Sequence, residues 1–198
     1  LREFITQLKK IEEIKTIMGA DWNLEIGVLT LLSQKEEKGP ALLFDQIKDY
    51  PKGYRVFTNA LNTINRSALA LGFPPGLKPM EYVLLCKELD KKIKPIKPVV
   101  VKDGPVMENI DEGKNINILK FPTPLWHEDD GGRYIGTGSV DINQDPDTGW
   151  VNLGTYRVMV HDEKTLGFYI SPGHHGRIIR EKYYSKGQPC KVAVSFGH

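Results

Sequence analysis

Two adjacent histidines, His174 and His175, stand between an apolar stretch and an amphipathic basic stretch. Gly173 and Gly176 flank them, and glycine lets the backbone bend sharply and leaves space for a ligand to approach. The pattern predicts a strand that turns into a helix, and a helix start offers backbone N–H groups and positive dipole to a phosphate. An imidazole there can ligate a metal ion or bond a phosphate oxygen, but two solvated turn histidines are the ordinary interpretation of this stretch alone.

A second candidate group lies earlier, in the apolar strand pattern "GWVNLGTYRVMV". Asn152, Tyr156 and Arg157 are polar groups that are costly to bury without partners. Strict alternation puts Asn152 and Tyr156 on one face of the strand, with Thr155 and Arg157 on the other. A bulge at Gly154 would change this register, so that Asn152 and Arg157 face one ligand. An edge strand with solvated polar side chains remains the alternative.

The stretch "FPTPLWHEDDGGRYIGTG" carries a third group, the acidic residues Glu128, Asp129 and Asp130. These carboxylates can bind a cation, but charge runs of this kind more often form a solvated turn. The glycines that follow lie before and within a predicted strand rather than between a strand and a helix. They therefore form neither a dinucleotide-binding fingerprint nor a P-loop.

The elements that must position these groups fall into two regions. Helical patterns interspersed with short strands come first, and strand patterns dominate from about residue 99. Helices are predicted over 1–17, from a cap at Asp21 to about 36, over 60–72, 79–93 and 176–186. Strands are predicted over 41–45, 54–59, 95–103, 116–121, 133–143, 150–160, 166–171 and 190–196, with hairpin turns in "DPDTG" and "HDEKTLG". We therefore expect an α+β chain with an N-terminal α/β domain over 1–115 and a β-rich domain over 116–198.

Composition is that of a globular protein with a substantial core: 198 residues, 40% hydrophobic, with a net charge of +2. This charge does not favour a nucleic-acid partner, and the apolar runs are too short to span a bilayer. The first residues do not resemble a signal peptide, so we expect a cytoplasmic location. Cys86 and Cys190 lack CxxC partners, which favours free thiols over a zinc or redox site. Since the chain starts without Met and stops after a strand pattern, we expect it to belong to a longer polypeptide.

Taken in order, the motifs resemble the N-terminal portion of the UbiD family, decarboxylases that use prenylated FMN. The resemblance covers roughly residues 39–198 and is most specific in the β-rich part. It rests on the stretches "GPALLFDQIKDYP", "RVFTNAL", "ALALG", "FPTPLWHEDDGGRYIGTG", "WVNLGTYR" and "ISPGHHGRI".

The resemblance implies roles for the candidate residues. In that family the Asn of an N-L-x-x-x-R segment ligates a divalent metal, which makes Asn152 a metal ligand here. The backbone after this Asn and the closing Arg contact the flavin, which implicates Thr155, Tyr156 and Arg157. The family's metal-binding His matches His175, and His174 becomes a cofactor neighbour. Asn, His and phosphate oxygens form a hard site that suits Mn²⁺ or Mg²⁺, with K⁺ as a further candidate.

The resemblance also implies the fold, the reaction and the partners. It implies the start of a split β-barrel like that of flavin reductases, and non-oxidative decarboxylation of an aromatic or α,β-unsaturated acid. Arg157 would orient the substrate carboxylate. The family's third metal ligand, a Glu, and its acid/base carboxylates come later than residue 198. A flavin prenyltransferase would supply the cofactor, and the full-length parent would be a homo-oligomer.

Three alternatives stay open at this point. The protein can be a carboxylase or a carboxylase subunit, with the same site residues and a different direction or partner. It can be a protein that binds flavin phosphate without turnover. A metal hydrolase built on the histidine pair is the weakest alternative, because no HExxH-type spacing supports it.

Overall fold

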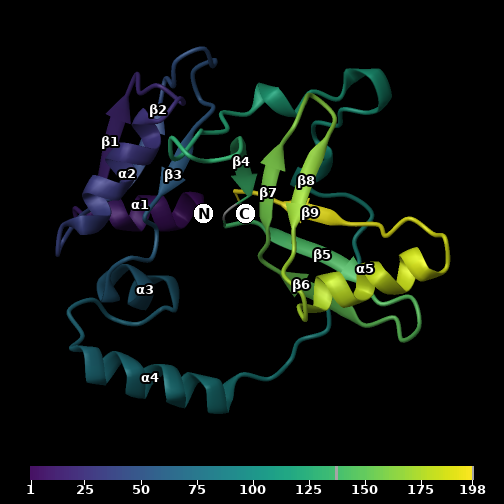
Figure 1. Cartoon of the computed structure of the whole chain (residues 1–198). Coiled ribbons are helices and arrows are strands. Elements are labelled where there is room, and N and C mark those ends of the chain that lie inside the picture. Colours follow the sequence, from purple (N-terminus) through teal and green to yellow (C-terminus); the bar gives the residue numbers. More distant parts are fainter. Residues whose placement is uncertain (137, 198) are drawn as a thin grey trace.

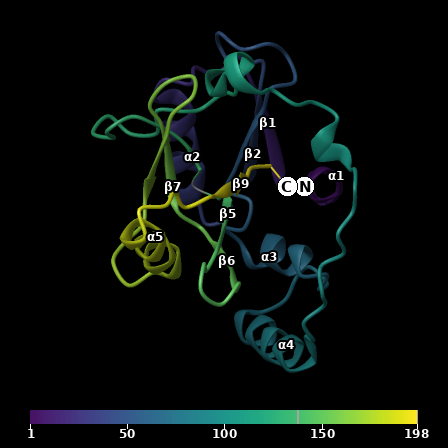
Figure 2. The same cartoon turned by 90° about the vertical axis from the view of Figure 1, so that its right-hand side faces the viewer.

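The computed structural model describes residues 1–136 and 138–197, in which five α-helices and nine strands form two regions (Figures 1 and 2). The helices are α1 (Arg2–Lys10), α2 (Glu25–Lys35), α3 (Ile64–Ala70), α4 (Pro79–Lys92) and α5 (His175–Ser185). The strands are β1 (Ile14–Met18), β2 (Ala41–Asp45), β3 (Val56–Thr58), β4 (Arg133–Gly136), β5 (Val140–Gln144), β6 (Val151–Gly154), β7 (Arg157–Val160), β8 (Leu166–Tyr169) and β9 (Ala193–Ser195). Short 3₁₀ turns lie at Pro105–Met107, Gly113–Asn115 and Ile118–Lys120.

The N-terminal region is built on the sheet β1-β2-β3, in which β2 pairs parallel to β1 and antiparallel to β3. The strand β2 is an uninterrupted apolar run whose first four residues are buried, as expected of a central strand covered on both faces. The core cluster between this sheet and α2 consists of Ala20, Ile26, Leu42, Phe44 and Ile47. This region is therefore a small α/β unit with its own core.

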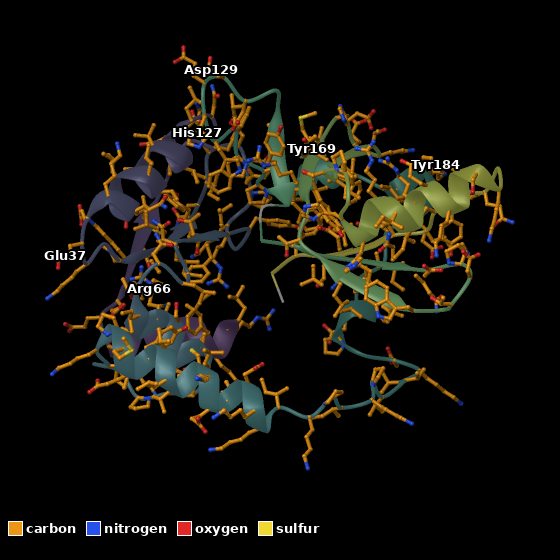
Figure 3. The ribbon with its side chains drawn as sticks, turned by 60° about the horizontal axis from the view of Figure 1, so that its bottom comes forward. Glu37, Arg66, His127, Asp129, Tyr169 and Tyr184 are labelled. Carbon is orange, nitrogen blue, oxygen red and sulfur yellow. The ribbon has the colours of Figure 1, made fainter. Side chains whose placement is uncertain are left out.

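A buried ion pair ties α3 to this sheet. Arg66 is fully buried, and its Nη1 donates to a carboxylate oxygen of Glu13 at 3.2 Å and to the Gly39 carbonyl at 3.0 Å. Glu13 also accepts hydrogen bonds from the side chains of Thr63 and Asn65. Figure 3 labels Arg66 at this helix, distant from α5. The ion pair therefore holds α3 against the residues that precede β1 and β2 in the N-terminal region.

The two regions are joined by the segment that precedes β4. Leu125 exchanges backbone hydrogen bonds with Trp22 and Leu24, and a Cβ on Gly27 would lie 1.9 Å from the Trp126 carbonyl oxygen. Only a glycine in α2 permits this approach of the two backbones. Arg133 of β4 makes a further contact across this junction. Its guanidinium lies 4.0 Å from the centre of the Trp22 ring, in a cation–π interaction.

The β-rich region holds two further antiparallel sheets, β4-β7-β8 and β6-β5-β9. The chain passes from one to the other three times, between β4 and β5, between β6 and β7, and between β8 and β9. Helix α5 packs on β5 and β6 (Figure 1). Its far end is held by Lys182, whose Nζ lies 2.6 Å from Asp145 and 3.2 Å from Asp147 in the β5–β6 turn. Hydrogen bonds from Lys182 and from backbone amides of this turn lower the pKa of Asp145 to about 2.

Two sequence-based predictions in the N-terminal region are wrong. The helix predicted over 1–17 ends at Lys10, because Glu12 adopts a positive φ of 57° and residues 14–18 pair with β2. The second helix begins at Glu25 rather than at an Asp21 cap. The Asp21 carboxylate instead accepts the Asn23 N–H and pairs with Lys48.

Four predicted strands are also corrected. Residues 95–103 are exposed and form no strand, because no neighbouring strand pairs with them in the described residues. The stretch 116–121 contains the turn Ile118–Lys120 instead. The stretch 150–160 is two strands, β6 and β7, that belong to different sheets. The stretch 133–143 likewise holds β4 and β5, and Thr137 within it lies outside the described residues.

The α+β class is confirmed, with an α/β unit followed by small antiparallel sheets. The hairpins β5–β6 and β7–β8 and the helices α3, α4 and α5 lie where the sequence predicts them. No helix in the described part of the chain has the length and apolarity needed to cross a bilayer.

Candidate functional site

Five of the six residues to which the family resemblance gives a role line one open pocket between the end of β6 and the start of α5. The pocket has a volume of about 330 Å³. Its lining residues are Asn152, Leu153, Gly154, Thr155, Tyr156, Gly173, His174 and His175. Two stretches that are separate in the sequence thus meet at one place. A volume of this size is at the lower end of small-molecule pockets.

The break between β6 and β7 forms one wall of this pocket. The chain leaves one sheet after Gly154 and joins the other at Arg157, and the carboxylate of Asp141 accepts the Tyr156 N–H at 2.7 Å in between. Asp141 is buried, with 1% of its surface exposed, and Ser139 is its second hydrogen-bond partner. Burial raises the pKa of the Asp141 carboxyl, while the hydrogen bonds from Tyr156 and Ser139 oppose that rise.

The phenol of Tyr156 fills the space between β6 and α5. A Cβ added to Gly154 would lie 2.4 Å from the Tyr156 ring, and one added to Gly176 would lie 2.6 Å from its hydroxyl. Both glycines are therefore required by the close approach of this ring. The Tyr156 hydroxyl accepts the N–H of Gly176 at 3.0 Å, so the ring also fixes the first turn of α5 relative to the strand.

The amide of Asn152 has a defined orientation. Its Nδ2 donates to Asn143 Oδ1 at 3.0 Å and to the Tyr156 hydroxyl at 3.2 Å. Only 3% of the residue is exposed, yet it lines the pocket. Its Oδ1 has no recorded hydrogen-bond donor among the described residues, so this oxygen is the atom offered to the pocket.

Each histidine is paired with an aromatic ring from the β6 segment. The His175 imidazole meets Trp150 edge-on, with ring centres 5.1 Å apart. The His174 imidazole meets Tyr156 in the same manner at 6.4 Å. Both histidines are otherwise exposed. The aromatic contacts restrict the imidazole orientations at the mouth of the pocket and leave ring nitrogens accessible to a ligand.

The expectation of several unpaired N–H groups at the helix start needs correction. Gly176 donates its N–H to Tyr156, and Arg177 and Ile178 donate theirs to the His174 carbonyl. In residues 1–136 and 138–197, the first-turn amide without a recorded partner is that of His175, and the amide of Thr155 across the pocket also has none. The anion-binding capacity of the pocket thus rests on single amides from two segments.

Arg157 is the predicted residue that does not line the pocket. It opens β7, is exposed, and lies opposite Tyr169 of β8 in the register. Tyr169 is itself exposed, as Figure 3 shows at the end of its strand. The strand break therefore separates Arg157 from Asn152, and the alternative in which a bulge lets both face one pocket is not what the described residues adopt.

The donor set of the pocket fits a hard divalent cation. An amide oxygen and an imidazole nitrogen are ligands that Mn²⁺ and Mg²⁺ accept, and a phosphate held by the Thr155 and His175 amides would add oxygen ligands to them. No group of three or more His, Cys, Asp or Glu side chains converges in the described part of the chain. The pocket alone thus provides two protein ligands.

The acidic cluster lies elsewhere. His127 and Asp129 lie in the loop before β4, well separated from α5 in Figure 3. Asp130 closes this loop by accepting the His127 N–H at 3.0 Å. The arrangement is that of a capped, solvated turn.

Three residues that support the site were not found from the sequence. Asp141 and Asn143 lie two residues apart on the same face of β5. Trp150 directly precedes β6. The signal was present in "SVDIN", where three polar residues, Ser139, Asp141 and Asn143, alternate with two apolar ones. Their burial depends on β6, β9 and α5, which lie far away in the sequence.

Comparisons with known proteins identify the family to which both regions are similar. The family model of the 3-octaprenyl-4-hydroxybenzoate carboxy-lyase Rift-related domain matches residues 97–198. The model of the N-terminal domain of the same carboxy-lyase matches residues 5–83. Together they span both regions of the fold.

Curated relatives include decarboxylases. The chain is 33% identical over 204 residues to pyrrole-2-carboxylic acid decarboxylase of Pseudomonas aeruginosa, covering 99% of this chain and 41% of that protein. It is 31% identical over 215 residues to ferulic acid decarboxylase 1 of Saccharomyces cerevisiae, with coverages of 99% and 41%. The chain thus spans about two fifths of the length of these relatives.

Solved structures share the fold over the whole chain. The closed form of vanillic acid decarboxylase from Sedimentibacter hydroxybenzoicus superposes with a TM-score of 0.89 at 28% identity, covering 100% of this chain and 42% of that one. An evolved dimeric form of HmfF from Pelotomaculum thermopropionicum, a UbiD-class enzyme in complex with prenylated FMN (prFMN), gives 0.84 at 27% identity, with coverages of 99% and 44%.

Proposed function

The chain belongs to the UbiD family of carboxy-lyases, and from this premise we propose that it carries the cofactor-binding part of a decarboxylase for aromatic or α,β-unsaturated carboxylic acids. The reaction would use prenylated FMN and a divalent metal ion. The similarity to pyrrole-2-carboxylic acid and ferulic acid decarboxylases supports the substrate class, and the similarity to the HmfF complex supports the flavin. The observation that carries the proposal is the convergence of Asn152 and His175 on one pocket.

In this proposal Asn152 and His175 are the metal ligands, through Oδ1 and an imidazole nitrogen. The metal, Mn²⁺ or Mg²⁺, would neutralise the flavin phosphate, and K⁺ is a further candidate ion at the site. Thr155, Tyr156 and His174 would contact the cofactor from the pocket wall. When bound, the prenylated flavin supplies the electron sink for loss of CO₂.

Arg157 would hold the substrate carboxylate. Guanidinium is charged at all relevant pH values and pairs with a carboxylate in a fixed, two-point geometry. Arg157 follows Tyr156 directly and is exposed, so it is accessible to a substrate beside the pocket. Its role in the reaction is to orient the acid.

Further parts of the proposal concern the whole protein. The β-rich region would form the start of a split β-barrel, with a domain boundary between residues 115 and 116. The parent protein would be a cytoplasmic homo-oligomer, supplied with cofactor by a flavin prenyltransferase and without a nucleic-acid partner. The proton donor to the product carbon would be a Glu later in the parent chain.

The test is CO₂ release from a panel of aromatic and α,β-unsaturated acids by the full-length protein, produced with a flavin prenyltransferase. We expect turnover of at least one acid, and a loss on the order of 100-fold or more in Arg157→Ala because orientation of the reacting group is lost. Arg157→Lys is the control, since it keeps the charge without the two-point geometry. Its rate of CO₂ release should lie between those of the wild type and Arg157→Ala.

Other outcomes distinguish the alternatives. A protein that retains flavin but converts no acid is a flavin-binding protein rather than a decarboxylase. Incorporation of labelled bicarbonate into the product, without net CO₂ release, identifies a carboxylase. Normal turnover in Arg157→Ala removes the role of Arg157.

A further inference from the structure

We propose that Asn143 is a positioning residue, which determines that Asn152 presents its oxygen rather than its nitrogen to the pocket. The inference rests on the proposed function only for the identity of the ligand, a divalent cation. Its structural basis is a directed chain of hydrogen bonds from the first turn of α5 to the Asn152 amide.

The chain of hydrogen bonds begins at the carbonyl of Gly176, which can only accept. Asn143 donates to it from Nδ2 at 3.2 Å. The remaining oxygen of Asn143 must then face Asn152, which donates its own Nδ2 at 3.0 Å. Each amide has one accepting oxygen and one donating NH₂ group, so fixing one end fixes all the others. The Asn152 oxygen is left for the pocket.

The Tyr156 hydroxyl cannot set this orientation by itself. A hydroxyl both donates and accepts, and its hydrogen rotates to suit the partner. It could therefore serve the Asn152 amide in either orientation, while still accepting the Gly176 N–H. Of the two partners of Asn152 Nδ2, only Asn143 has the orientation of its own donor and acceptor fixed by a neighbour, the Gly176 carbonyl.

The two asparagines are also held in place by the sheet. Asn143 of β5 and Asn152 of β6 lie directly opposite each other in the register. They are buried, with 6% and 3% of their surfaces exposed. Paired positions of this kind hold their side chains within contact distance. Neither amide can turn to water to compensate for a lost partner, so a mismatch would be costly.

The test compares Asn143→Asp with Asn143→Leu in the full-length protein, with Mn²⁺ alone as the probe and electron paramagnetic resonance of free Mn²⁺ as the readout. Both variants lose the donor to Gly176, but only Asp keeps an acceptor facing Asn152. We expect Asn143→Leu to weaken Mn²⁺ binding about tenfold or more, in the range seen for residues that orient metal ligands. Asn143→Asp should bind Mn²⁺ at least as well as the wild type. Its carboxylate still accepts the Asn152 amide N–H, and its negative charge favours binding of a cation nearby.

Equal loss in both variants, or wild-type binding in Asn143→Leu, would overturn the inference. A second readout does not depend on the metal: the Tm losses of Asn143→Leu and Asn152→Leu should be less than additive in the double variant, since both remove one shared hydrogen bond. Additive losses would also overturn it. If the wild type binds no Mn²⁺, the metal site of the proposed function fails, and the Tm comparison still decides the role of Asn143.

Discussion

At the scale of single residues, the pocket depends on polar groups that are buried behind it. Asp141 is the clearest case, because its carboxylate holds the Tyr156 N–H at the point where the chain leaves one sheet for another. A neutral acceptor of the same shape would hold this amide equally well. The charge of Asp141 is therefore a cost to stability that the hydrogen bond does not require.

The raised pKa of Asp141 gives stability a defined dependence on pH. In the pH range between the ordinary carboxyl pKa of 3.8 and the raised value, the folded state binds more protons than the unfolded state. Stability from this group is therefore present at low pH and is lost as the pH rises through the raised pKa.

We predict that Asp141→Asn is at least as stable as the wild type at pH 7. Its oxygen can still accept the Tyr156 N–H, and the loss of stability on raising the pH from about 4 should diminish. The measurement is urea unfolding of both proteins from pH 4 to pH 8. A variant that is less stable at pH 7, with an unchanged pH profile, would show that the charged form of Asp141 is the stabilising one.

Local chemistry could single out Asn152, Tyr156 and His175 as candidates, because polar groups adjoin or interrupt apolar patterns there. It could not assign their roles, since solvated turn and edge-strand positions explain the same patterns. The proposed ligand roles of Asn152 and His175 came from the resemblance to the UbiD family. Asn143 is equally important to the geometry, but its partners are Gly176 and Asn152. Which polar residue of a strand is buried against which partner depends on strand pairing that a local pattern does not contain.

At the scale of elements, the contact between Tyr156 and Gly176 couples the start of α5 to the β6–β7 break. The ring occupies the space where two Cβ atoms would otherwise lie, and its hydroxyl accepts an N–H of the helix. The helix therefore carries His174 and His175 to the pocket only if this contact forms. Gly154 and Gly176 are therefore needed because a side chain at either position would overlap the Tyr156 ring.

We predict that Gly176→Ala displaces Tyr156 or tilts α5, because its Cβ would lie 2.6 Å from the phenol oxygen. Overpacking of this kind costs about 1–3 kcal/mol, or a Tm loss of roughly 2–12 °C. Thermal unfolding measured by circular dichroism checks the prediction. Ile178→Ala, at an exposed position of the same helix, is the matched control and should change the Tm little. A Gly176→Ala protein with the same Tm as the Ile178→Ala control would contradict the packing account.

The errors in predicting elements have physical causes. Ile11, Ile14 and Ile17 continue the apolar stripe of α1 at a spacing of three, which is a helical period, although Ile14 and Ile17 belong to a strand. Parallel pairing of β1 with β2 decided the outcome. The stretch 95–103 has the composition of a strand, but composition does not provide a neighbouring strand to pair with. Tertiary partners, rather than propensity, determined both cases.

At the scale of the whole molecule, the N-terminal region and the β-rich region are joined by a junction at Trp22, Leu125 and Arg133. The N-terminal core packs between β1-β2-β3 and α2, at the opposite side of Figure 1 from the strands and helix of the β-rich region. All residues that line the candidate pocket come from the end of β6, the segment after it and the start of α5. The pocket is therefore built by the β-rich region alone. This explains why all the residues that line the pocket lie between 152 and 175 in the sequence.

The central claim is that this pocket binds prenylated FMN together with one divalent metal ion. Native mass spectrometry of the full-length protein, produced with a flavin prenyltransferase, tests it most directly. We predict masses for prenylated FMN and one divalent ion in the wild type, and joint loss of both in Asn152→Ala and in His175→Ala. Asp129→Ala, in the loop far from α5, is the control and should retain both. A folded wild type that carries neither group, or retention of both groups in the two pocket variants, would contradict the account.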